Sequence, residues 1–438
     1  MNIVAGDRTI PWRNEVTEDW PCGVIKYECR INPEVLSEST NPVQELDYID
    51  IGGVSSTGVI STPERIIYED APSRARRLPK YGDTIISTVR TYLKAIAAID
   101  WHQGDPRLVC STGFAILRSS GEVDPRFLYW WMRSDRIVNE IVSRSTGVSY
   151  PAINASEIGC LSIPKPPTET QRRIAAFLDR KTAAIDALIA KKQRLITLLK
   201  EKRQALITHA VTKGLNPNAP MKDSGIPWIG CIPEHWSVAQ VKRFWKVIDC
   251  KHKTVPFLDN GEYPLASIGE VKGLKVDLAT ANRTSEEYYH AMIEGGRRPT
   301  PGDIIYSRNA TVGESALVVD ENGAFAMGQD VCLIRPQSGS PMYAWLQLNA
   351  EHITNQLEAA MVGATFRRIN VGVVKCFWAC APPDEEQAAI AAHCQTILQR
   401  TDSFLHAQVR SLAKLTEYRQ ALITAAVTGQ LPTPEVAA

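Results

Sequence analysis

Two long segments of the chain carry apolar residues at the alternating three- and four-residue spacing of an amphipathic helix. Residues 168–211 and 384–428 contain neither proline nor glycine, and each segment follows a Pro-Pro pair. The apolar positions are Ile174, Leu178, Ile185, Leu188, Leu195, Leu199 and Leu206 in the first segment, and Ile390, Ile397, Phe404, Leu415 and Leu422 in the second. This spacing predicts two long helices that pack as a coiled coil. At about 1.5 Å per residue, about 44 residues make a helix of roughly 65 Å.

Both predicted helices carry start and stop signals. Thr-x-x-Gln at 168–171 and Asp-x-x-Gln at 384–387 have the spacing of a capping box. Gly214 and Gly429 follow the last apolar positions, and glycine is common just past a helix C-terminus. A single amphipathic helix of this length needs a partner for its apolar face, and we expect the two helices to pack antiparallel.

The other parts of the chain alternate β-rich runs with glycine and proline, a pattern typical of strands and turns. The runs are 46–60, 81–100, 108–118 and 150–163, then 263–278, 302–319, 331–335 and 369–381. Residues 124–134 and 340–350 have the pattern of short amphipathic helices. We therefore predict α+β globular parts with a mostly antiparallel core.

The chain is a tandem repeat, which constrains its architecture. PW-x7-W begins at Pro11 and Pro227, PP-x-E-x-Q at Pro166 and Pro382, and QALIT-x-AVT at Gln204 and Gln420, each pair 216 residues apart (227 minus 11, for example). The predicted segments are globular domain 1–165, helix 166–215, globular domain 216–381, helix 382–431 and tail 432–438. Antiparallel helices in this order imply a pseudo-two-fold axis, and a two-fold protein suits two half-sites on opposite DNA strands.

Composition narrows the class of protein. The 438 residues suggest at least two domains, and 44% hydrophobic with 22% charged residues is typical of a globular protein. No apolar stretch is long enough to cross a bilayer, and the N-terminus lacks the apolar core of a secretory signal. We expect a cytoplasmic protein with reduced cysteines and no bound metal, because the nearest pair, Cys376 and Cys380, lacks a second ligand pair. The net charge of +1 does not by itself indicate a partner.

Catalytic signatures are missing from the sequence. The [DNS]PP[YFW] motif of an adenine-N6 methyltransferase is absent, and Val59 stands where a phosphate-binding loop needs lysine. Asp83 and Asp303 follow glycine before apolar runs, a pattern more typical of a turn into a strand than of a nuclease site. We therefore predict a non-catalytic chain. A two-domain scaffold that does not bind DNA and an unrecognised nuclease are the alternatives.

The repeated motifs, together with the glycine loops before Ile153-Asn154 and Ile369-Asn370, resemble the specificity subunit of Type I restriction-modification systems. The resemblance implies two target recognition domains that read the halves of a split, asymmetric double-stranded DNA site. It also implies two adenine-N6 methyltransferase subunits docked on the helices, and motor-nuclease subunits that join for cleavage. S-adenosylmethionine, ATP and magnesium are then expected in those partners, with no cofactor in this chain.

Candidate DNA contacts are basic, amide and aromatic residues in the globular parts. Arginine can read guanine and asparagine can read adenine, whereas lysine more often contacts phosphate. The candidates are Arg74, Arg76, Arg77, Arg90, Tyr92, Lys94, Ser149 and Tyr150 in the first copy, and Lys272, Lys275, Arg308, Asn309, Thr311, Thr365, Phe366, Arg367 and Arg368 in the second. The loops 146–154 and 362–370 are favoured because both precede a long helix at equivalent places. The alternative is that most of these charges are solvated surface.

The apolar seam and the QALIT-x-AVT ends are the candidate partner interface. Gln204 and Gln420 lie at equivalent places, and identical ends favour a shared partner site over packing alone.

Overall fold

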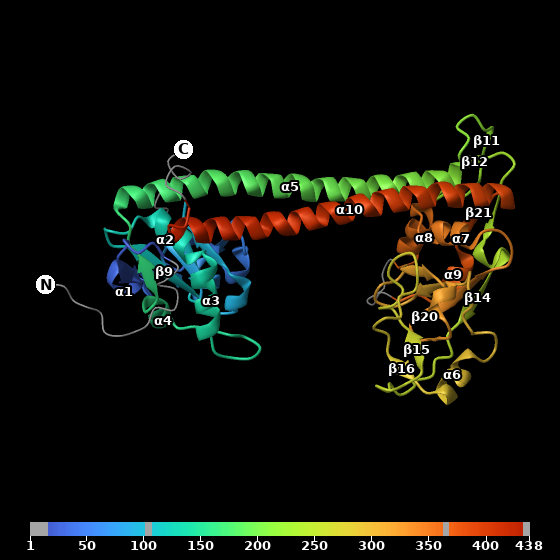
Figure 1. The fold of residues 1–438 in the computed structure, drawn as a ribbon, viewed down its shortest axis with the longest axis horizontal. Helices are drawn as coiled ribbons and strands as arrows, with labels where there is room; N and C mark the ends of the chain where they lie inside the picture. The colour runs from blue at the N-terminus through green and yellow to red at the C-terminus, as the bar shows by residue number, and fades with distance from the viewer. Residues whose placement is uncertain (1–15, 101–106, 362–367, 432–438) are drawn as a thin grey trace. The chain divides into compact units, whose positions relative to one another are not determined.

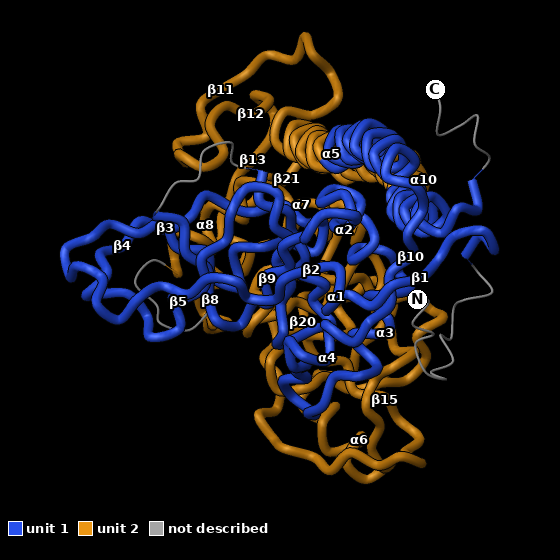
Figure 2. The backbone as a smooth tube through the Cα atoms, turned by 90° about the vertical axis from the view of Figure 1, so that its left-hand side faces the viewer, with its two compact units in different colours: residues 1–193, 409–438 blue, residues 194–408 orange. Residues whose placement is uncertain are grey.

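The computed structural model describes residues 16–100, 107–361 and 368–431. It divides into two compact units (Figure 2), with residues 1–193 and 409–438 in unit 1 and residues 194–408 in unit 2. The long helices α5 (Thr168–Lys213) and α10 (Asp384–Val427) each begin in one unit and end in the other. Each unit therefore contains one globular part and half of each helix. The predicted boundaries at 165, 215 and 381 treat each long helix as a segment of its own. The division into two units does not test these boundaries, so they stay a prediction.

Both long helices end where the sequence predicts. Gly214 and Gly429 adopt left-handed φ values of +77° and +78°, which glycine tolerates without strain. In unit 2 the ring of Trp236 packs beside Gly214, and in unit 1 the ring of Trp20 packs beside Gly429, so a Cβ at either glycine would crowd an indole. The second tryptophan of PW-x7-W thus covers a helix end in both copies.

Unit 1 is built on two four-stranded sheets. One has the order β2 (Cys29–Ile31), β9 (Phe114–Ser119), β6 (Thr84–Ser87), β7 (Ile96–Ala98), and the other β4 (Glu64–Ile67), β3 (Glu45–Ile49), β8 (Leu108–Ser111), β5 (Ala75–Arg77). A two-stranded sheet pairs β1 (Cys22–Val24) with β10 (Ser162–Pro164). Only β3 and β8 pair in parallel.

Unit 2 repeats this plan. Its four-stranded sheet has the order β14 (Trp245–Asp249), β20 (Val331–Pro336), β17 (Ile304–Ser307), β18 (Ser315–Leu317), and β13 (Ser237–Gln240) pairs with β21 (Trp378–Ala381). A three-stranded sheet orders β16 (Arg283–Thr284), β15 (Tyr263–Ala266) and β19 (Ala326–Met327), and β11 (Met221–Asp223) pairs with β12 (Cys231–Pro233). The predicted α+β class with a mostly antiparallel core is confirmed.

The short helices agree only in part with the sequence prediction. The expected pair is present as α2 (Pro125–Met132) and α7 (Pro341–Leu348). The β-rich runs 150–163 and 369–381 contain the short helices α4 (Ala155–Gly159) and α9 (Val371–Cys376), and an asparagine, a residue common at helix N-caps, precedes each of them. The helices α1 (Ile25–Glu28), α3 (Asp135–Arg144), α6 (Glu286–Ile293) and α8 (Glu351–Met361) were not predicted.

Each unit has a hydrophobic core between its sheets, its short helices and its halves of the long helices (Figure 1). In unit 1, Phe127 and Trp131 of α2 are fully buried beside Leu178 of α5 and Ile423 of α10. Burying one large aliphatic or phenyl side chain stabilises a fold by roughly 1.5–3 kcal/mol. The ends of the long helices are thus held mainly by the globular parts.

The predicted apolar seam is buried near the helix ends and exposed between them. Ile174, Leu178, Ile390 and Leu422 are buried, Ile185, Leu199, Ile397 and Leu415 are partly exposed, and Leu188, Leu195, Leu206 and Phe404 are exposed. The seam prediction is wrong by one residue at two places, where Ile207 and Leu405 face inward instead of Leu206 and Phe404. A straight helix has 3.6 residues per turn, so its inward face drifts away from a strict heptad pattern.

Glutamines of the repeated motifs hold the two ends of α2 and α7. In unit 1, the backbone N–H of Asp124 before α2 donates to Gln171 Oε1 at 2.7 Å, and Gln420 Nε2 donates to the carbonyl of Arg133 after α2 at 2.7 Å. Gln171 also donates to the carbonyl of Pro166 at 2.8 Å rather than closing the expected capping box. The short helix α2 is therefore fixed to α5 at its start and to α10 at its end.

The same contacts recur in unit 2. The N–H of Ser340 donates to Gln387 Oε1 at 3.2 Å, and Gln204 Nε2 donates to the carbonyl of Asn349 at 2.6 Å. Thr208 Oγ1 accepts the N–H of Glu351, the first residue of α8, at 3.0 Å. The identical QALIT-x-AVT ends thus have a packing role inside each unit, which the sequence interpretation did not anticipate.

All ten cysteines lie among the described residues and all are free thiols. Burial raises the pKa of Cys29, Cys110 and Cys332 to about 12, so these thiols stay protonated and unreactive at neutral pH. Cys231 and Cys376 are exposed. In the part of the chain that the structure describes, no helix is long and apolar enough to cross a membrane.

Candidate nucleic-acid interface

In unit 1 the structure brings together two loops that the sequence singled out. Val89, after β6, bridges Ala152 in the glycine loop, and the N–H of Ile153 donates to the carbonyl of Thr88 at 2.9 Å. The guanidinium of Arg90 lies over the ring of Tyr150, 4.8 Å from its centroid. The candidate contacts Tyr92, Lys94 and Ser149 are exposed on the same two loops.

The corresponding loops of unit 2 meet in the same way. Asn309 bridges Arg368 as Val89 bridges Ala152, and Arg368 is exposed. Asn309 Nδ2 donates to Asp330 Oδ1 at 3.1 Å, while Thr311 is half-buried and lies 3.2 Å from Ser307 through their hydroxyls. The candidates Thr365, Phe366 and Arg367 lie outside the described residues.

Arg308 does not belong to this surface. Its side chain is only 4% exposed, and one guanidinium nitrogen lies 2.9 Å from Asp249 Oδ1 and 3.3 Å from Cys250 Sγ. The expectation that Arg308 contacts DNA is therefore corrected, since its guanidinium is buried and pairs with a carboxylate and a thiol. Its partner lies on β14, which the sequence around Arg308 does not reveal.

The remaining basic candidates are dispersed. Arg76 donates to the Tyr68 hydroxyl at 2.8 Å, and Arg77 is half-buried in β5, which leaves Arg74 exposed. In unit 2, Lys272 is exposed, and Lys275 lies 3.7 Å from Glu321. None of these residues belongs to the loop pairs at Arg90 and Arg368.

One cluster of metal-ligating side chains exists among the described residues. The ligand atoms of Asp249, Cys250 and His252 all lie within 4.8 Å of one another. The Arg308 guanidinium contacts both Asp249 and Cys250, so a cation already neutralises the cluster. Burial also raises the pKa of the Cys250 thiol, which disfavours the thiolate that a metal would need. The site therefore has the character of a buried ion pair.

Asp83 and Asp303, the acidic residues considered for a nuclease, have structural roles. Asp83 is buried and receives two bonds from Arg118 at 2.9 and 2.8 Å, and Asp303 receives two from Arg335 at 2.7 Å each. Each carboxylate also accepts a backbone N–H three residues earlier, from Lys80 or Thr300. The hydrogen bonds that Arg118 donates to Asp83, and Arg335 to Asp303, raise the pKa of both guanidinium groups. Both aspartates thus hold a turn, as the sequence pattern favoured.

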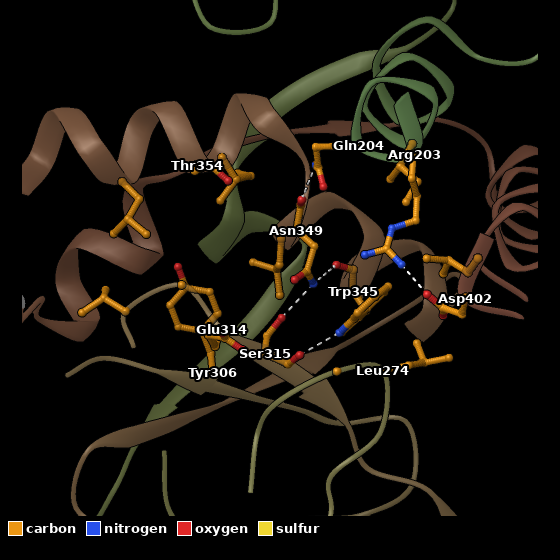
Figure 3. Close-up of a pocket in the computed structure, with 18 residues that line it drawn as sticks. Arg203, Gln204, Leu274, Tyr306, Glu314, Ser315, Trp345, Asn349, Thr354 and Asp402 are labelled. Carbon is orange, nitrogen blue, oxygen red and sulfur yellow. Dashed lines mark hydrogen bonds and ion pairs between the residues drawn. The ribbon is translucent and has the colours of Figure 1, made fainter. Parts of the chain in front are cut away.

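A cavity of about 490 Å³ lies within unit 2 where the long helices meet α7 and α8 (Figure 3). Arg203 and Asp402 form an ion pair in its wall, and the Trp345 indole donates to the carbonyl of Ser315 at 2.9 Å. Unit 1 has a cavity of about 420 Å³ whose lining includes Asp186 and Arg419, which also form an ion pair. These residues are the repeat equivalents of Asp402 and Arg203 (402 minus 186 and 419 minus 203 are both 216). A cavity with an ion pair in its wall thus occurs in both copies of the repeat.

Large apolar side chains face solvent on both long helices. They are Leu188, Leu195, Leu198 and Leu206 on α5, and Phe404, Val409 and Tyr418 on α10, each at least 38% exposed. Spacings of 7 and 18 residues return to nearly the same angle around an α-helix, so Leu188, Leu195 and Leu206 share one face of α5. These three side chains therefore form a row of exposed leucines along α5.

Comparisons with known proteins agree with the fold. The family model described as "Type I restriction modification DNA specificity domain" matches residues 34–198. A putative type I restriction enzyme specificity subunit, MjaX, of Methanocaldococcus jannaschii is 22% identical over 95% of each chain. The solved HsdS subunit of Thermoanaerobacter tengcongensis is 25% identical, with a TM-score of 0.52 over 95% of this chain and 98% of its own. A chain solved in work on complex assembly and conformational transition of the type I R-M system is also 25% identical, with a TM-score of 0.74 over 95% of this chain and 99% of its own.

Proposed function

Because the chain belongs to the specificity subunits of Type I restriction-modification systems, we propose that units 1 and 2 each read one half of a split, asymmetric DNA target. The observation that carries this proposal is the pair of equivalent loop junctions. Val89 with Ala152 and Asn309 with Arg368 are matching bridges that present exposed basic side chains beside strand ends. The side chains at the two junctions differ, so the two half-sites differ as well.

At the first junction, Arg90 and Tyr150 are the contacts we expect to touch DNA. An arginine with free guanidinium edges can form two hydrogen bonds to guanine, worth about 1–3 kcal/mol of discrimination. Stacking on Tyr150 restrains the guanidinium, so less entropy is lost when it binds. At the second junction, Arg368 is exposed, and Asn309 is held by Asp330 and is the weaker candidate.

The chain directs chemistry that its partners perform. The carboxylates of Asp83 and Asp303, which a nuclease centre would need, are each neutralised by an arginine, and this supports a non-catalytic role. Adenine-N6 methylation and restriction then reside in methyltransferase and motor-nuclease subunits, which would bring S-adenosylmethionine, ATP and magnesium. The exposed apolar row on α5 and α10 is the surface on which two methyltransferase subunits would dock, one for each repeat.

The test is methylation sequencing of a host that carries this chain with its methyltransferase partner. The wild-type chain should direct methylation to one bipartite motif. Arg90→Ala should relax or weaken one half of that motif, and Arg368→Ala the other half. Lys242→Ala, an exposed residue of unit 2 outside the loops, serves as the control and should leave the motif unchanged.

Three outcomes would contradict the proposal. Equal loss in both halves with Arg90→Ala would mean that this residue supports the fold or contacts phosphate. Failure to bind DNA in the presence of the methyltransferase would favour the scaffold alternative. Metal-dependent cleavage by the isolated chain would favour the nuclease alternative.

A further inference from the structure

The turn from Arg90 to Lys94 in unit 1 exposes large apolar side chains at its tip. Tyr92 is 52% exposed and Leu93 is 43% exposed, and the neighbouring glycine loop adds Val148, which is fully exposed. Single exposed apolar residues are common on protein surfaces, but several on one loop pair are not. Their position beside the proposed reading residues Arg90 and Tyr150 places this apolar tip within the proposed DNA interface.

The turn has a strained backbone that its surroundings hold in place. Arg90 and Lys94 adopt left-handed φ values of +50° and +55°, a conformation that residues other than glycine rarely adopt. The N–H of Lys94 donates to the carbonyl of Thr91 at 3.0 Å, and the Thr91 hydroxyl lies 2.8 Å from that of Ser145. Tyr92 and Leu93 are therefore presented on a preformed turn.

Two cations flank the apolar tip. Arg90 and Lys94 are both exposed, and neither forms an ion pair with any residue that the structure describes. The tip therefore consists of two apolar side chains that lie, along the chain, between two exposed, positively charged side chains. A surface that places apolar side chains between a cation proposed to read a base, Arg90, and a second cation free to contact phosphate, Lys94, fits a nucleic-acid duplex better than a protein partner.

The equivalent turn of unit 2 keeps the backbone but not the side chains. Ala310 and Gly313 are left-handed at +54° and +98°, and Ser307 N–H donates to the carbonyl of Glu314 at 2.8 Å, as Ser87 N–H does to that of Ala95 at 2.9 Å. This turn is one residue shorter than that of unit 1, and its apolar residue, Val312, packs against the core. The repeat thus provides an internal comparison in which only unit 1 carries the exposed tip.

We infer that the turn Arg90–Lys94 is a wedge that inserts Tyr92 and Leu93 between base pairs while Arg90 and Lys94 hold the flanking DNA. This inference rests on the proposed function, since it requires unit 1 to read DNA. Apolar side chains inserted at a base step unstack and kink the duplex. The wedge unstacks the half-site read by unit 1 and leaves the other half stacked. A kink there also lowers the cost of extruding a base, which an adenine methyltransferase requires.

The experiment uses the full chain in complex with its methyltransferase subunits on a duplex that carries its target. 2-Aminopurine replaces single adenines along both half-sites, other than the adenines that are methylated and their neighbours, because base extrusion by the methyltransferase would unstack those in either half. Its fluorescence rises where stacking is lost. With the wild-type complex, fluorescence should rise in one half-site only. The Tyr92→Ser, Leu93→Ser double variant should lose this rise, while Lys94 keeps its contribution to the salt dependence of binding.

Two further variants separate the wedge from a general effect on the surface. Tyr92→Phe with Leu93→Met keeps the bulk and apolar character of the tip and should keep the fluorescence rise. Val43→Ser removes another exposed apolar side chain of unit 1, in the loop before β3, and should change nothing.

The outcomes distinguish the wedge from the proposed function. If the wild-type complex binds its target but neither half-site becomes unstacked, or both do equally, the wedge is wrong and the proposed function stands. If the double variant still unstacks its half-site, the wedge is also wrong. If the wild-type complex neither binds nor methylates any DNA, the proposed function itself has failed.

Discussion

The ion pairs Asp186–Arg419 in unit 1 and Arg203–Asp402 in unit 2 provide a test of how burial sets the strength of a charge pair. The two pairs occupy equivalent places in the repeat, but their surroundings differ. Arg419 is 7% exposed at its side chain and forms two bonds to Asp186, at 2.8 and 3.0 Å. Arg203 is 27% exposed and forms one contact with Asp402.

Removal of the carboxylate should therefore have unequal effects. Asp186→Ala leaves a buried guanidinium without its partner, which should cost about 1.5–3 kcal/mol, the range for hydrogen bonds to charged groups. Asp402→Ala leaves a guanidinium that water can reach, so its cost should be about 0.2–1 kcal/mol, as for exposed pairs. The difference of roughly 1–2 kcal/mol follows from the deeper burial of Arg419 and from its second bond to the carboxylate, since the residue types are the same.

Hydrogen exchange measured by mass spectrometry is the appropriate assay, because a chain with two units need not unfold in one step. Peptides from 409–427 report on the first pair and peptides from 194–213 on the second. The change in local opening free energy is compared with that of Glu417→Ala, an exposed control on α10 that should have little effect. Equal losses at the two pairs, or a larger loss for Asp402→Ala, would refute the argument from burial.

Three further predictions follow from the structure. Burial lowers the pKa of His352 to about 4, so unit 2 should lose about 3 kcal/mol of stability as the pH falls from about 6.5 toward 4. Urea unfolding at pH 7 and pH 4.5 should show this loss, and the variant His352→Leu should remove the pH dependence. Cys231 and Cys376 are exposed and should react with maleimide well before the buried thiols, as peptide mapping after brief labelling would show. Seven residues inserted between Leu188 and Leu195 lengthen α5 by about 10 Å. Methylation sequencing should then show a gap between the half-sites that is longer by up to about three base pairs. An unchanged gap with full activity would exclude α5 as a spacer.

The long helices could be predicted because their signals are local. The absence of proline and glycine, the spacing of apolar residues and the final glycines all act within one element, and α5 and α10 match the prediction to within a few residues. The burial of individual seam residues was less predictable. Whether Leu206 or Ile207 faces inward depends on where the globular part contacts the helix, and this contact involves residues far away in the sequence.

The candidate site was predictable where the backbone repeats and unpredictable where single side chains decide. The glycine loops at equivalent places in the two copies predict Tyr150 and Arg368 as candidates, whereas the pairing of each loop with the turn after β6 or β17 is seen only in the structure. The burial of Arg308 depends on Asp249, which lies on a strand that is not adjacent to β17 in the sheet. The apolar tip at Leu93 lies in a run that its composition predicts as strand, so no sequence signal marks it as exposed.

The repeated residues and the differing residues perform separate tasks in this molecule. Gln171 and Gln387, like Gln204 and Gln420, bind the carbonyl or N–H groups at the ends of α2 and α7, so they fix a globular part to the helices whatever its loops contain. The paired left-handed residues likewise fix the path of each reading turn, while its side chains change from an exposed apolar tip to a packed one. A scaffold of this kind can acquire a new target by loop changes alone, because the four glutamines that hold the ends of α2 and α7 lie outside the loops proposed to read bases.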